Sequence, residues 1–129
     1  MKTNKIFSLI VLTALMICGF APATVSAGVT QANDQNFSQI TSSGVAVVDF
    51  YADWCGPCKR LAPTFSKLSG EMSNVTFVKV DIDNARQVAK QYNISSIPAI
   101  IVLKDGKEVR RNVGALEANA LKSMIQSAQ

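Results

Sequence analysis

The sequence predicts an α/β fold in which a mixed central β-sheet is covered by helices on both faces. Segments with a strand pattern alternate with segments of helical periodicity along the chain from about Gly28 onward. The run Val45–Tyr51 is apolar on both faces, which is typical of a central strand covered by helices. Near the other end, Asp105-Gly106 is a two-residue turn signal, so the strands on either side of it are expected to be antiparallel.

The first expected strand is short, Val29–Ala32. Asn33 or Asp34 is expected to cap a helix that runs to about Thr41, because Asn and Asp are preferred N-cap residues. Ser42-Ser43-Gly44 then ends this helix before the central strand begins.

A longer helix is expected from Cys58 to about Met72, with a kink at Pro63. Its apolar residues recur at spacings of four and three on one face: Leu61, Phe65 and Leu68.

The segment Val75–Ile82 alternates as a strand does and precedes a short helix expected over Asn84–Tyr92. One face is expected to carry Val78, Val80 and Ile82, and the other Lys79, Asp81 and Asp83. The last two strands are expected over Ala99–Lys104 and Glu108–Val113, and an amphipathic helix from Leu116 to about Ser127 closes the chain.

Residues 1–27 have the pattern of a secretory signal peptide, which leaves residues 28–129 as one domain. Lys2 and Lys5 precede the apolar stretch Ile6–Phe20, and Val25-Ser26-Ala27 supplies small residues at a cleavage site. We therefore expect export, to the periplasm if the signal is bacterial. An uncleaved signal that anchors the chain in a membrane is the alternative, although the apolar stretch is short for a span of about 20 residues.

Charge and residue counts exclude several functions. The net charge of +4 falls to +2 once Lys2 and Lys5 are removed, which gives no case for nucleic-acid binding. The chain has no histidine and, after loss of Cys18, two cysteines. This excludes a Cys-His protease pair and a Cys/His zinc site, and no metal or separate cofactor is expected.

Those two cysteines lie in Trp54-Cys55-Gly56-Pro57-Cys58, between the central strand and the long helix. Cys55 is expected near a helix N-terminus, where free N–H groups and the helix dipole favour a thiolate. Cys55 is thus the expected nucleophile, and is expected to be the more exposed of the two. Cys58 is the expected buried resolving thiol of a thiol–disulfide exchange reaction.

The chain from about Gly28 onward resembles the thioredoxin family. The resemblance rests on four separate features: the stretch Val48–Cys58, Pro63 in the long helix, Ile97-Pro98, and Val113-Gly114-Ala115. It implies the thioredoxin fold for residues 28–129. It also implies a redox-active Cys55–Cys58 disulfide and disulfide-containing proteins as substrates. A monomer is expected.

Asp49 is a carboxylate in an otherwise apolar strand. Burial would raise its pKa and allow it to relay a proton to or from Cys58, which is the role of the matching aspartate in the family. The alternative is a strand-end aspartate that faces solvent or pairs with a cation. Lys79 matches the family lysine near this aspartate, and its alternative is a solvated strand lysine.

The resemblance also implies a cis peptide bond before Pro98 and a docking surface for an extended substrate. Ala99 stands where the family usually has threonine. The residues expected to form or shape this surface are Trp54, Gly56, Pro57, Ile97, Pro98, Gly114 and Ala115.

The expected function is an exported disulfide reductase, because Gly56-Pro57 resembles the dipeptide of reducing thioredoxins. Export implies a membrane thiol-transfer partner that supplies electrons. One alternative is an exported oxidase or isomerase, which an oxidising compartment favours. Another is a non-catalytic binding or chaperone module that uses the groove at Ile97-Pro98.

Overall fold

The computed structural model describes residues 28–129, so the predicted signal peptide lies outside the described residues. The elements are, in chain order, β1 (Val29–Ala32), α1 (Phe37–Thr41), β2 (Val45–Tyr51), α2 (Gly56–Glu71), β3 (Val75–Asp81), α3 (Arg86–Gln91), β4 (Ala99–Lys104), β5 (Lys107–Val113) and α4 (Ala118–Gln126). Within these residues, none of the helices is both long enough and apolar enough to cross a membrane.

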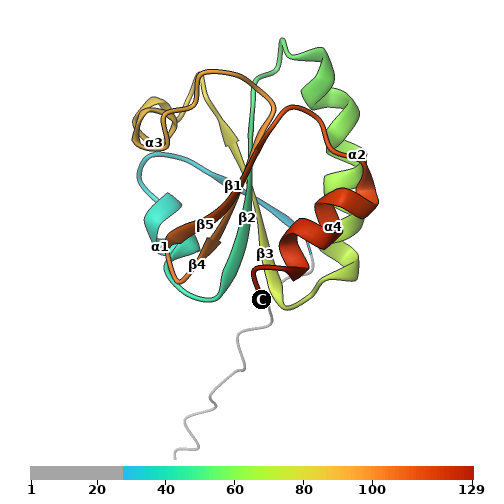
Figure 1. The fold of residues 1–129 in the computed structure, drawn as a ribbon. Coiled ribbons are helices and arrows are strands. Elements are labelled where there is room, and N and C mark those ends of the chain that lie inside the picture. The colour runs from blue at the N-terminus through green and yellow to red at the C-terminus, as the bar shows by residue number, and fades with distance from the viewer. Residues whose placement is uncertain (1–27) are drawn as a thin grey trace, which may run out of the picture.

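The five strands form one mixed sheet at the centre of the fold (Figure 1), in the order β1-β3-β2-β4-β5. The pairs β1–β3 and β2–β3 are parallel, whereas β2–β4 and β4–β5 are antiparallel. As predicted, β2 is central, and residues 46–50 of this strand are fully buried. The strand therefore gives the residues that follow its C-terminal end a rigid attachment.

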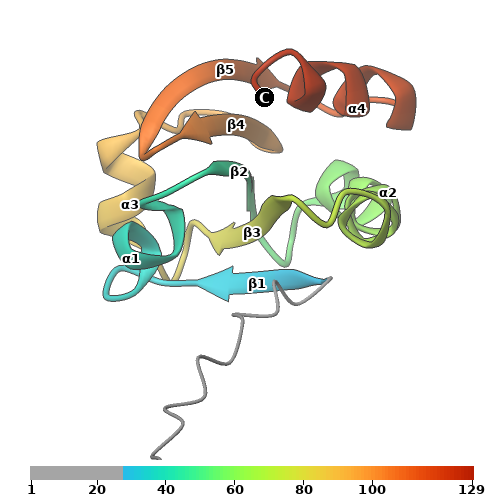
Figure 2. The same cartoon turned by 90° about the horizontal axis from the view of Figure 1, so that it is seen from below.

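Helices cover both faces of the sheet, as predicted. Figure 2 shows α1 and α3 on one side of the strands and α2 and α4 on the other. Two apolar clusters correspond to these layers. One joins the sheet to Phe37 and Val88, and the other joins it to Phe65, Leu121 and Ile125. Each face thus has its own core, which explains why the central strand is apolar on both faces.

The prediction that Asn33 or Asp34 caps α1 is wrong. The helix begins at Phe37, after a turn in which Asn33 Oδ1 accepts hydrogen bonds from the backbone N–H groups of Gln35 and Asn36. A short Asn or Asp side chain can bond to nearby backbone in this way instead of capping a helix. Asp34 bonds to the backbone of α3 instead.

Other helix boundaries differ from prediction by one or two residues. Helix α2 begins at Gly56 rather than Cys58, because Cys55 is its N-cap and Pro57 suits the first turn. Pro63 lies inside α2, where its missing N–H leaves the helix one backbone hydrogen bond short. Helices α3 and α4 are shorter than predicted at both ends.

The face of β3 that carries Lys79 and Asp81 is largely covered. Phe77 and Val75, on the same face as Lys79, belong to the core beneath α2 and α4. Asp81 is only 6% exposed, and its oxygens accept hydrogen bonds from the Asp83 N–H and the Asn84 side chain. The turn after β3 therefore forms around a buried carboxylate.

The turn at Asp105-Gly106 has positive φ at both residues, 50° and 80°, as a type I′ hairpin requires. The prediction of a hairpin between the last two strands is confirmed.

Candidate active site

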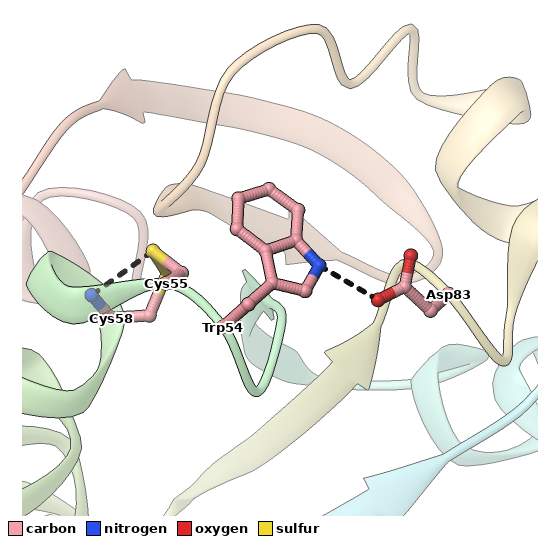
Figure 3. Close-up of a disulfide and its surroundings, with 4 residues drawn as sticks. All are labelled: Trp54, Cys55, Cys58 and Asp83. Carbon is pink, nitrogen blue, oxygen red and sulfur yellow. Dashed lines mark hydrogen bonds between the residues drawn. A yellow bond between two sulfur atoms is a disulfide. The ribbon is translucent and has the colours of Figure 1, made fainter.

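Cys55 and Cys58 are joined by a disulfide at the junction between β2 and α2, with their Cα atoms 5.3 Å apart. The Cys55 sulfur accepts a hydrogen bond of 3.2 Å from the Cys58 backbone N–H (Figure 3). Cys55 thus lies at a helix N-terminus, as predicted: it is the N-cap of α2, and its sulfur is at the positive end of the helix dipole. This position stabilises a thiolate at Cys55 when the disulfide is reduced.

Both cysteines are buried in the disulfide form, and Cys55 is only marginally the more exposed of the two. The two residues are 5% and 3% exposed. Both belong to a small apolar cluster with Ala52, against which Ile82 and Ile97 pack. Side chains from three separate segments therefore cover the disulfide.

Asp49 is fully buried in β2, and neither of its carboxylate oxygens has a hydrogen-bond partner. Burial raises the pKa of Asp49 from 3.8 to about 6, and the positive charge of Lys79 partly opposes this rise. The predicted burial and raised pKa are confirmed, and the solvent-facing alternative is wrong. A carboxyl group with this pKa can gain or lose a proton near neutral pH.

Lys79 is the β3 residue directly opposite Asp49 in the sheet. Its ammonium lies 4.1 Å from the centroid of the Tyr51 ring, and no ion pair joins it to Asp49 in the part of the chain described. Lys79 is half-buried, so it is not a freely solvated strand lysine. It is also not directly bonded to the Asp49 carboxylate.

A pocket of about 120 Å³ opens beside Cys58, between Tyr51, Lys59 and Lys79. It gives the buried end of the disulfide a route to solvent. A larger hollow of about 270 Å³ lies between α2 and α4 and is lined by neither cysteine.

Trp54 is the most prominent residue of the expected docking surface, with 69% of its area exposed. Its indole N–H donates a hydrogen bond of 2.9 Å to Asp83, and Figure 3 shows the ring between the disulfide and that carboxylate. Other expected members are also accessible: Gly56, Pro57 and Ala115 are exposed, and Ile97 and Gly114 are half-buried.

Pro98 is buried, so it does not itself form exposed surface, contrary to expectation. The Ile97–Pro98 peptide bond is cis, as the resemblance implies. The Pro98 carbonyl accepts a hydrogen bond of 2.8 Å from the Gly114 N–H, and Gly114 has a φ of 102°. Pro98 therefore connects the two loops at this side of the disulfide, and Ala99 does not prevent this arrangement.

The family model for thioredoxin matches residues 28–127 of this chain. The chain belongs to the thioredoxin family. With its Cys55–Cys58 pair, it is a thiol–disulfide oxidoreductase that acts on protein disulfides.

Sequence relatives and solved structures agree with this assignment. Thioredoxin of Chlamydia trachomatis serovar D is 45% identical over 97 residues, covering 75% of this chain and 95% of the relative. Thioredoxin of Bacillus subtilis is 43% identical over 98 residues, covering 75% and 94%. The long form of thioredoxin f from spinach chloroplast superposes with a TM-score of 0.76 at 32% identity, covering 81% and 88%. A mutant thioredoxin from Halobacterium salinarum gives a TM-score of 0.74, also at 32% identity, covering 78% and 90%.

The sequence reasoning missed three residues of this thioredoxin site: Tyr51, Asp83 and Val113. Tyr51 is the last residue of β2, and Asp83 lies just after the end of β3. These two strands are parallel, so their carboxyl ends meet at one edge of the sheet. That topology was the available signal for their proximity to the disulfide. Val113 is 56% exposed and precedes Gly114, so it enlarges the apolar surface.

Proposed function

We propose that this protein is an exported disulfide reductase. The Cys55 thiolate attacks a substrate disulfide and forms a mixed disulfide, and one substrate sulfur leaves as a thiolate. Cys58 then attacks Cys55, which releases the second substrate thiolate and leaves the Cys55–Cys58 disulfide. The substrate gains the two electrons that the cysteine pair loses.

The observation that carries the reductive direction is the Gly56-Pro57 dipeptide between the cysteines, with no histidine beside the Cys55 sulfur. Gly56 and Pro57 separate the two cysteines, and no histidine exists anywhere in the chain to hold the thiolate as an ion pair. A less stabilised thiolate makes the dithiol a stronger reductant, since strong oxidants owe their potential to a stabilised reduced form.

Asp49 and Lys79 complete the proposed machinery. Cys58 must lose its proton to attack Cys55, and the unpaired Asp49 carboxylate is the proposed general base. Because burial raises the Asp49 pKa to about 6, the group is largely ionised at neutral pH and still basic enough to take a proton. Lys79 tunes that pKa through its charge.

The proposed docking surface consists of Trp54, Gly56, Pro57, Ile97, Gly114 and Ala115, with Pro98 beneath it. An extended substrate segment would pair with the Ile97 backbone while apolar side chains contact the indole. Such a surface suits flexible or partly unfolded proteins.

Export rests on the signal-peptide pattern in residues 1–27. An exported reductase needs electrons from the cytosolic side, so the proposed donor is a membrane thiol-transfer protein. The proposed working form is a monomer in the periplasm, without a cofactor other than its own disulfide.

The test of direction is the reduction potential of the Cys55–Cys58 pair in defined thiol/disulfide buffers. A value near the thioredoxin end of the known scale, about −270 mV, is expected for a reductase. A value near the DsbA end, about −120 mV, would contradict the proposal and make the protein an oxidase or isomerase. Replacing both cysteines with serine tests the binding-module alternative, which predicts unchanged function.

Export is tested separately, by fractionating cells that express the full chain and sequencing the N-terminus of the protein. A soluble exported protein that begins at Gly28 is expected. Full-length protein in the membrane fraction would indicate the uncleaved anchor, and retention in the cytosol would contradict export.

A further inference from the structure

Lys79 lies opposite Asp49 in the sheet, yet its ammonium contacts an aromatic ring. The Lys79 Nζ atom is 4.1 Å from the centroid of the Tyr51 ring. A cation over a ring face is attracted by the ring quadrupole, and more strongly where water is partly excluded. Tyr51 and Lys79 are both half-buried, so this contact competes with the Asp49 carboxylate for the ammonium.

The Tyr51 ring is itself held in place by a hydrogen bond to β1, the strand on the other side of Lys79 from Asp49. Its hydroxyl donates a hydrogen bond of 3.1 Å to the side-chain oxygen of Gln31. Gln31 is the β1 partner of Lys79, just as Asp49 is its β2 partner. Gln31, Lys79 and Asp49 thus form a row across β1, β3 and β2. Tyr51 contacts two members of this row, Gln31 through its hydroxyl and Lys79 through its ring. Burial also raises the pKa of Tyr51 above its usual value of 10, so the hydroxyl keeps its proton.

Asp49 has no comparable partner. Neither oxygen accepts a hydrogen bond, and its β4 partner Ile100 is apolar. The polar groups paired with Asp49 in the row across the sheet are Lys79 of β3 and, beyond it, Gln31 of β1. The other polar or charged groups on the neighbouring elements line the pocket that Lys79 also lines: Cys58 and Lys59 of α2, and Tyr51 and Asp53 at the end of β2. Of these, Lys79 is the one whose charge lowers the pKa of Asp49.

We propose that Tyr51 is a positioning residue whose ring withholds the Lys79 ammonium from Asp49 and so keeps that buried carboxyl group unpaired. The geometry itself does not depend on the direction of electron flow. The inference rests on the proposed function only in assigning the Asp49 proton to Cys58. With the ring removed, the ammonium is free to pair with the orphan carboxylate across the strands.

The test is a carbon-13 NMR titration of the Asp49 carboxyl group in the oxidised protein. With Tyr51→Leu, the Asp49 pKa is expected to fall from about 6 to about 5 or lower, as for a carboxylate that gains a close cation. Tyr51→Phe is the matched control: it keeps the ring and removes only the hydroxyl, so the Asp49 pKa should stay near that of the parent protein. An unchanged or higher pKa with Tyr51→Leu would overturn the proposal.

The same titration in a Lys79→Met background separates positioning from a general packing effect. There, Tyr51→Leu should leave the Asp49 pKa where Lys79→Met alone puts it. A fall of the same size in both backgrounds would show that the ring acts without the lysine, which also overturns the proposal.

A measurement on the unaltered protein covers the case in which Tyr51→Leu does not fold. Ring currents should shift the ε-methylene protons of Lys79 upfield, and Tyr51→Phe should preserve this shift. Unshifted protons would contradict the contact. None of these readouts depends on the reduction potential. A potential typical of an oxidase would contradict the proposed reductase function but not the positioning role of Tyr51. An Asp49 pKa that does not change with Tyr51→Leu would contradict the positioning role but not the reductase function.

Discussion

The carboxylate of Asp34 accepts a hydrogen bond of 2.9 Å from the backbone N–H of Val88, 54 residues further along the chain. Val88 lies in the first turn of α3, and Ala85, the N-cap residue of that helix, has no side chain that could bond to it. Asp34 therefore supplies from a distant loop the cap that the local sequence lacks, and it connects the loop before α1 to the start of α3.

Replacing Asp34 should destabilise the fold without touching the disulfide. Asp34→Ala is expected to lower the free energy of unfolding by about 1 kcal/mol, the usual loss for an N-cap. Urea denaturation measures this change. Asp34→Asn keeps an acceptor oxygen and should lose less, so equal losses for the two variants would contradict the capping role.

The two cysteines should behave differently toward substrates. With Cys58→Ser, a substrate disulfide attacked by Cys55 cannot be resolved, so mixed disulfides should accumulate and turnover should stop. Cys55→Ser should trap little, because Cys58 lacks the N-cap position. Non-reducing electrophoresis after mixing with a disulfide-containing protein checks this, and stronger trapping by Cys58 than by Cys55 would reverse the assigned order.

Asp49 should make the protein less stable as the pH rises. The folded chain holds the Asp49 proton up to about pH 6, whereas the ordinary pKa is 3.8. Between these values the folded state binds more protons than the unfolded state, so the free energy of unfolding falls with increasing pH. The difference between 3.8 and about 6 corresponds to about 3 kcal/mol, fully lost above pH 6 to 7.

Denaturation curves recorded from pH 4 to pH 8 measure this loss. Asp49→Asn is the matched comparison, because it keeps the shape of the side chain and removes its titration. The free energy of unfolding of Asp49→Asn should depend much less on pH over this range, even if the substitution changes the stability itself. An equally steep dependence in both proteins would mean that Asp49 titrates normally in the fold.

The hydrogen bond from Trp54 to Asp83 should matter more for protein substrates than for small disulfides. Asp83→Ala frees the indole, and loss of about 1 kcal/mol of positioning corresponds to about a fivefold higher KM for a protein disulfide. The rate with a small-molecule disulfide should change little. Asp53→Ala, which removes an exposed carboxylate next to Trp54, is the control and should not reproduce the effect.

The sequence predicted the strands better than the helix ends. β1, β2 and β4 have the predicted bounds, because each is an apolar or alternating run between turn residues. The ends of the helices depend on groups that periodicity does not report. Cys55 starts α2 through its sulfur, and Asp34 caps a helix that is remote in sequence.

The reactive pair was predictable from its spacing before a helix, but its environment was not. The burial of Cys55 depends on Ile82 and Ile97, which only the folded chain brings to the disulfide. The contact between Lys79 and Tyr51 likewise depends on the register of β2 against β3. Spacing identifies groups that are close along the chain, whereas these contacts arise from strand pairing.

The place of β2 in the sheet affects how the molecule responds to partial unfolding. This strand has hydrogen-bonded neighbours on both sides, whereas β1 and β5 each have one. Local opening starts at such margins, and the amide hydrogens of central strands exchange last. Because the cysteine pair follows β2 directly, fraying of either margin leaves the sulfur atoms in their working arrangement. The cysteine pair is therefore connected to the part of the fold that heat or denaturant disrupts last.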